Sequence, residues 1–97
     1  MDLPEYRAEM GFSHRELLGG LPSAVDPYSI HKQDPFLYLI CHEDRVARLQ
    51  LGEERTRKIA AIRIPVTDVV IQFENFNEQQ HTEFIDRFKM YLHKGGG

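Results

Sequence analysis

Residues 36–74 read FLYLICHEDRVARLQLGEERTRKIAAIRIPVTDVVIQFE, and the predicted fold is built around this segment. Short runs of β-branched and other apolar residues alternate in it with polar turns, a pattern typical of consecutive β-strands. A polar turn at Glu43-Asp44 and a corner at Pro65-Val66 are expected to join neighbouring strands, and Gly52–Arg57 is expected to form a charged loop. The predicted strands are Tyr28–Gln33, Phe36–Cys41, Val46–Leu51, Lys58–Ile64 and Val69–Phe73.

Two helices flank this stretch. Ser13 and Glu16 have the spacing of a capping box, but Gly19-Gly20 lowers helix propensity and Pro22 interrupts the chain, so we expect only about two turns. The second helix is predicted over Asn77–His93, because its apolar residues recur at three- and four-residue spacing. Residues 1–12 show no clear period and are predicted to form an N-terminal arm.

The 97 residues are enough for one domain, which we place over 1–97. The predicted class is α+β. We expect a two-layer sandwich in which an antiparallel four- or five-stranded meander has a short N-terminal helix and a long C-terminal helix on one face, because a helix stripe and a sheet face bury each other.

Charge and cysteine content narrow the class of function. The net charge of −3 argues against nucleic-acid binding, which usually needs a basic surface, and no apolar run is long enough to span a membrane. The first residues lack the apolar stretch of a secretory signal. A single cysteine, Cys41, cannot form an internal disulfide, so we expect a cytoplasmic protein.

Alternation along the strands divides the sheet into two faces. Tyr38, Leu49 and Ile71 represent the predicted core face, to which Phe36, Ala60 and Ile62 are also assigned. The opposite face is predicted to carry an apolar island made of Leu37, Leu39, Cys41, Ile59 and Val70. Exposed apolar patches with polar rims often mark interfaces, so one interpretation is a homodimer contact or another protein partner. The other interpretation is that Leu3, Tyr6 and Met10 of the N-terminal arm cover the island.

Candidate chemistry is sparse, and we assign no catalytic residue and no cofactor. His31, His42 and Glu43 are candidate metal ligands by residue type, but adjacent strand positions point to opposite faces and no paired Cys or His motif is present. Cys41 beside His42 is a candidate nucleophile, although a lone cysteine on an apolar strand is usually a packing residue. The sequence therefore favours a small soluble, non-catalytic interaction or accessory domain.

Two alternatives stay open. The first is a small ligand- or metal-binding protein with its pocket near His31, Tyr38 and His42. The second rests on the tail Gly95-Gly96-Gly97, which resembles the ends of ubiquitin-like modifiers and sulfur carriers and implies a carrier role for Gly97. In those proteins the tail follows a strand, whereas here it follows a predicted helix, and a simple helix stop also explains these glycines.

Overall fold

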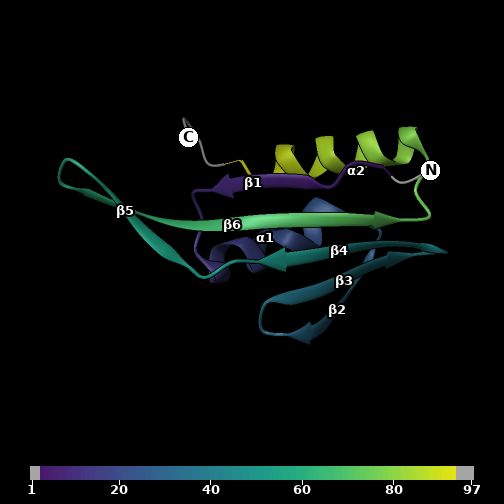
Figure 1. The fold of residues 1–97 in the computed structure, drawn as a ribbon, viewed down its shortest axis with the longest axis horizontal. Helices are drawn as coiled ribbons and strands as arrows, with labels where there is room; N and C mark the ends of the chain where they lie inside the picture. Colours follow the sequence, from purple (N-terminus) through teal and green to yellow (C-terminus); the bar gives the residue numbers. More distant parts are fainter. Residues whose placement is uncertain (1–2, 94–97) are drawn as a thin grey trace.

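The computed structural model describes residues 3–93 of the chain and shows one sheet with two helices (Figure 1). The elements in chain order are β1 (Tyr6–Met10), α1 (His14–Val25), β2 (Ser29–Asp34), β3 (Leu37–His42), β4 (Arg45–Leu51), β5 (Arg55–Ile59), β6 (Ile62–Glu74) and α2 (Glu78–Tyr91). The glycine tail, residues 95–97, lies outside the described residues. The predicted α+β class, with an antiparallel sheet, an N-terminal helix and a C-terminal helix, is confirmed.

The sheet has the strand order β1-β6-β4-β3-β2, and every neighbouring pair is antiparallel. The turn at Glu43-Asp44 places Cys41 opposite Val46, as the predicted register requires. Glu43 adopts a positive φ of 57° in this tight turn.

The N-terminal arm is a strand rather than a cover. β1 pairs with β6 at the edge of the sheet, with Tyr6 opposite Ile71. Its apolar residues face the helices, because Met10 is buried and Tyr6 packs against the same core. The expectation that Leu3, Tyr6 and Met10 fold across the outer face is therefore wrong.

The predicted corner at Pro65 is also wrong. β6 is continuous through Pro65, and the chain reverses instead at Ala60-Ala61, where Ile59 pairs with Ile62. Antiparallel pairing with β1 begins only at Thr67, so the side of β6 that carries the Pro65 nitrogen has no neighbouring strand there. The missing N–H consequently costs no ladder hydrogen bond. Part of the predicted charged loop becomes β5.

Helix α1 is longer than the sequence suggests. It contains Gly19, Gly20 and Pro22 and runs to Val25. The predicted capping boxes of both helices are present, with Ser13 accepting from the Glu16 amide at 3.0 Å and Asn77 accepting from the Gln80 amide at 2.8 Å. Packing against α2 explains the extra length, because buried residues recur along α1 to its end.

The core lies between the helices and one face of the sheet. Its largest fully buried apolar side chains are Phe88, Leu17, Leu21, Ile40, Leu49, Ile71, Val25 and Val69. Three positions predicted for the core are exposed: Phe36 at the turn before β3, and Ala60 and Ile62 at the end of the β5–β6 hairpin, which no helix covers. The buried Thr67 donates from its hydroxyl to the Phe12 carbonyl at 2.8 Å, which ties the β1–α1 connection to β6.

Candidate interaction surfaces

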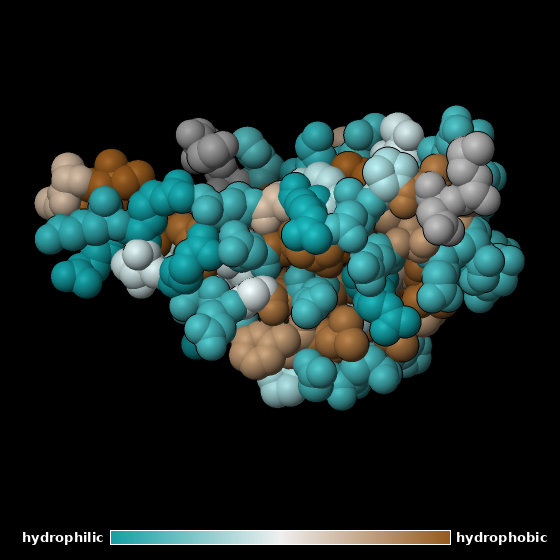
Figure 2. All heavy atoms as spheres, in the orientation of Figure 1, coloured by the Kyte–Doolittle hydropathy of each residue, from teal (hydrophilic) through white to brown (hydrophobic). Residues whose placement is uncertain are grey.

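The outer face of the sheet, on the side away from the helices, carries a column of apolar side chains on β3. Leu37, Leu39 and Cys41 are half-buried on this face, whereas the residues between them on β3 are buried in the core on the other face. We call the apolar residues of this face the outer patch: Leu37, Leu39, Cys41, Val46 and Val70. Within residues 3–93 both helices lie on the other side, and Figure 2 shows apolar surface between polar side chains on this face.

Two cross-strand rows cross the middle of the outer face. The first consists of Glu5, Gln72, Arg48, Leu39 and His31. The second consists of Arg7, Val70, Gln50, Leu37 and Asp34. The rows differ in charge at both ends, because an anion in one row stands beside a cation or histidine in the other. Arg7 and Glu5 form an ion pair within the chain.

A second exposed feature is the two-stranded ribbon of residues 55–66, which β5 and the first part of β6 form. We call this ribbon the arm, and it is distinct from the N-terminal arm predicted over residues 1–12. The arm projects beyond the rest of the sheet (Figure 1) and gives the molecule a longest extent of 46 Å against 27 and 23 Å for the other two axes. Its end is apolar, because Ile59 is 52% exposed and Ile62 is 62% exposed. Isolated two-stranded ribbons are marginally stable in water, so ion pairs at the base matter for the arm.

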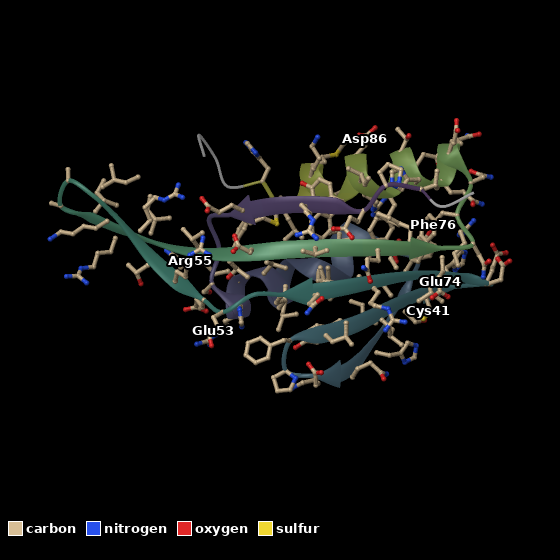
Figure 3. All side chains as sticks on the ribbon, viewed as in Figure 1. Cys41, Glu53, Arg55, Glu74, Phe76 and Asp86 are labelled. Atoms are coloured by element: carbon tan, nitrogen blue, oxygen red, sulfur yellow. The ribbon has the colours of Figure 1, made fainter. Side chains whose placement is uncertain are left out.

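The base of the arm is fixed by such pairs, as the position of Arg55 beside β6 in Figure 3 indicates. Arg55 Nη1 donates to Asp68 Oδ2 at 2.7 Å, and Arg55 Nη2 donates to Glu9 Oε2 at 2.9 Å. Arg57 also pairs with Glu9. The hydrogen bonds from Arg55 hold the pKa of the Asp68 carboxyl below its ordinary value.

The structure separates the residues predicted for a pocket. His31 stands opposite Leu39 on the outer face, Tyr38 is buried in the core, and the His42 ring lies 5.2 Å from the Tyr28 ring on the helix side. Glu43 lies 3.9 Å from His42 Nε2. No group of three potential metal ligands occurs among the residues that the structure describes.

Cys41 and Ile59 also have clear positions. Cys41 lies on the outer face at the same end of the sheet as Glu74 (Figure 3), on the opposite side of β3 from His42, so the two do not form a nucleophile and base. Ile59, which the sequence pattern grouped with Leu37 and Leu39, is at the end of the arm.

Within residues 3–93, two clefts border α2. The first, which we call the groove, lies between the arm, β1 and the end of α2 and has a volume of about 840 Å³. The second is lined by Tyr28, His42, Arg45 and residues of α2. Burial raises the pKa of the Tyr28 hydroxyl, against the opposing effect of the Arg45 guanidinium, which lies 5.5 Å from the centre of the ring. Arg45 Nε is buried and has no hydrogen-bond partner within residues 3–93.

Comparisons with models of known protein families, with curated proteins and with solved structures found no match. Neither helix in residues 3–93 combines the length and the apolar run needed to cross a membrane.

Neither the arm nor the groove was expected from the sequence pattern. One signal for the arm was present in the sequence: Ile59 and Ile62 are separated by two residues, the length of a tight hairpin loop. Ala60-Ala61 gives no turn signal, although Ala60 has a φ of 55°, which is rare for alanine. The groove depends on β1, which the sequence pattern did not reveal.

Proposed function

We propose that this chain is a small soluble, non-catalytic interaction or accessory domain of the cytoplasm that forms a two-fold homodimer through its outer sheet face. The observation that carries the proposal is the pair of rows across that face, which become complementary under a two-fold axis. The cytoplasmic location is supported by the single cysteine, and a protein partner of the same face is the closest variant of the proposal.

The geometry of the dimer follows from the register. An axis parallel to the plane of the sheet and above its outer face, perpendicular to the strands and between the two rows, places each residue of one row over the residue of the same strand in the partner's other row. Leu39 then faces Leu37 of the partner subunit, and Glu5 faces Arg7 of the partner subunit. Arg48 faces Gln50 of the partner subunit rather than another arginine, so like charges do not meet at the centre.

The size of the face is adequate for such a contact. Five strands spaced by about 4.8 Å and about three residues per strand on one face, spaced by about 6.7 Å, give a projected area of roughly 500 Å². A standard interface buries about 800 Å² of accessible surface on each partner, and side-chain relief raises the accessible area above the projected one. The face combines apolar side chains on β3 and β6 with polar and charged side chains around them, and protein interfaces commonly have such a mixed composition.

Sedimentation equilibrium tests the proposal with two matched variants. Leu39→Glu places a carboxylate at the centre of the outer patch, and Met90→Glu makes the same kind of change on α2, where the side chain is 71% exposed. We expect wild type and Met90→Glu to dimerise alike. Leu39→Glu should raise the dissociation constant at least ~100-fold, because burying an unpaired charge costs several kcal/mol. A wild type that stays monomeric at high micromolar concentration would contradict the proposal.

One observation favours a second candidate function, a small-ligand site in the cleft beside His42. The buried Arg45 Nε has an unused donor there, and the ring of Tyr28 forms an adjacent aromatic surface. Binding would be expected for a small planar ligand with one hydrogen-bond acceptor. A screen of such ligands by NMR, compared between wild type and Arg45→Met, checks it, and chemical-shift changes that persist in Arg45→Met would place the ligand elsewhere.

A further inference from the structure

The groove between the arm and the body joins an apolar floor to a cationic rim. Most of its lining is apolar: Tyr6, Ala8, Met10, Phe12, Ile59, Ile64, Pro65, Val66 and Leu92. The charged lining is dominated by cations, with Arg57, Arg63 and Lys89 at its borders. Glu9 is the acidic residue of the lining, and Arg55 and Arg57 already neutralise it.

The rim cations are available to an incoming anion. Arg63 and Lys89 are exposed, and neither has an ionic partner in the part of the chain that the structure describes. They stand on different elements, since Arg63 belongs to the arm and Lys89 to the last turn of α2. A ligand that meets both cations must therefore lie across the groove, over the apolar floor.

The backbone along the arm disfavours an added β-strand. Asp68 accepts from the Gly52 amide on the β4 side of β6, and successive residues of a strand use opposite edges. Arg63 and Pro65, at odd-numbered positions like Thr67, therefore direct their backbone groups to the open edge that borders the groove. Pro65 has no N–H, so a strand docked there would lose a ladder hydrogen bond.

We propose that the groove binds an acidic amphipathic helix of a protein partner. Such a helix buries an apolar stripe on the half-buried lining residues Tyr6, Phe12 and Ile64, and its acidic side chains meet Arg63 and Lys89. The groove is open along one side, which suits a helix that keeps its polar face in water better than a ligand that must be enclosed. The groove contains none of the residues of the two rows on the outer face, so this interaction and the proposed dimer can be tested separately.

A designed peptide tests the assignment. The probe is a fluorescent helix of about 14 residues with leucines at i, i+3, i+4 and i+7 and glutamates on the remaining face. Its first control has the same composition with the leucines scattered, and its second replaces glutamate by lysine. Fluorescence anisotropy measures binding to the full chain and to Leu39→Glu. We expect both proteins to bind the probe equally and to bind neither control.

Charge reversal locates the site. Arg63→Glu combined with Lys89→Glu should weaken binding of the acidic probe about tenfold. This factor corresponds to the binding free energy lost when two exposed ion pairs become repulsive contacts. The matched control, Arg15→Glu combined with Lys32→Glu, makes the same change in net charge at exposed positions outside the groove and should bind as wild type does. Circular dichroism checks that both double variants remain folded.

Several results would overturn the assignment. They are absence of probe binding at about 1 mM, equal binding of the scattered or basic control, or equal loss in both double variants. Binding of dodecanoate without binding of the peptide would indicate that the groove binds an acyl chain and not a helix. Loss of probe binding in Leu39→Glu would indicate that the peptide binds to the outer face instead of the groove. These results can be interpreted whether or not the wild type forms a dimer.

Discussion

Gly19 and Gly20 offer a sharp test of how α1 packs, because the two glycines are adjacent in the helix but have different surroundings. A Cβ at Gly19 would meet no atom within 4 Å, whereas a Cβ at Gly20 would lie 2.7 Å from Leu92 Cδ2. Leu92 is only 4% exposed and belongs to the core. Alanine substitutions at the two positions therefore share the same gain in helix propensity but differ in packing.

The magnitudes follow from these distances. Glycine in a helix interior costs about 0.5–1 kcal/mol relative to alanine, so Gly19→Ala should stabilise the protein by that amount. In Gly20→Ala the same gain is opposed by an overpacking cost of about 1–3 kcal/mol, because Leu92 must leave its position. We expect the free energy of unfolding to differ between the two variants by at least ~1 kcal/mol, with Gly19→Ala the more stable. For a domain of this size that difference is about 4–8 °C in melting temperature.

Urea denaturation followed by circular dichroism measures the free energy of unfolding of both variants. A Leu92→Ala background then isolates the cause of the difference between them. In Leu92→Ala, which lacks the clashing carbon, Gly20→Ala should become stabilising like Gly19→Ala. Equal stabilisation by Gly19→Ala and Gly20→Ala in the wild-type background would refute the proposed packing of α1 on Leu92. So would a deficit of Gly20→Ala that persists in Leu92→Ala.

Three further predictions concern single contacts. Asn77→Ala removes the α2 cap and should lower the free energy of unfolding by about 1 kcal/mol, measured by urea denaturation; no change would show that the cap is not used in solution. Thr67→Val leaves the Phe12 carbonyl without its hydroxyl donor and should cost about 1–2 kcal/mol by the same assay. Asp68 has a lowered pKa in the folded state, so its contribution to stability is present above its unfolded pKa of about 4 and is lost as pH falls through the lower folded value. Carboxyl ¹³C titration should show the Asp68 pKa rising towards the ordinary value in Arg55→Gln, and an unchanged pKa would exclude the Arg55 contact.

Local signals in the sequence were sufficient where short-range chemistry determines the structure. The capping residues Ser13 and Asn77 predicted the starts of both helices, and the turn at Glu43-Asp44 predicted the register of β3 and β4. In each case the determining contact lies within a few residues along the chain, so the sequence pattern contains both partners.

Contacts between distant segments could not be predicted from the sequence in the same way. β1 becomes a strand because Tyr6 and Met10 contribute to a core built mainly by later residues, and its own five residues show no decisive pattern. The arm was obscured because Ala60 adopts an unfavourable φ without a glycine or asparagine to signal the turn. Four members of the outer patch were predicted, namely Val70 and the three residues of β3, whereas Ile59 was misplaced by the register error at Pro65.

Contacts between the two subunits distinguish self-association through the outer face from every other mode of association. In a mixed sample of isotope-labelled and unlabelled chains, filtered NOE spectra report only contacts between subunits. We expect intermolecular NOEs between the methyl groups of Leu39 and Leu37 of the partner subunit, because the axis between the two rows brings them face to face. A dimer whose intermolecular NOEs come only from Ile59 and Ile62 of the arm, or a sample with none at millimolar concentration, would contradict self-association through the outer face.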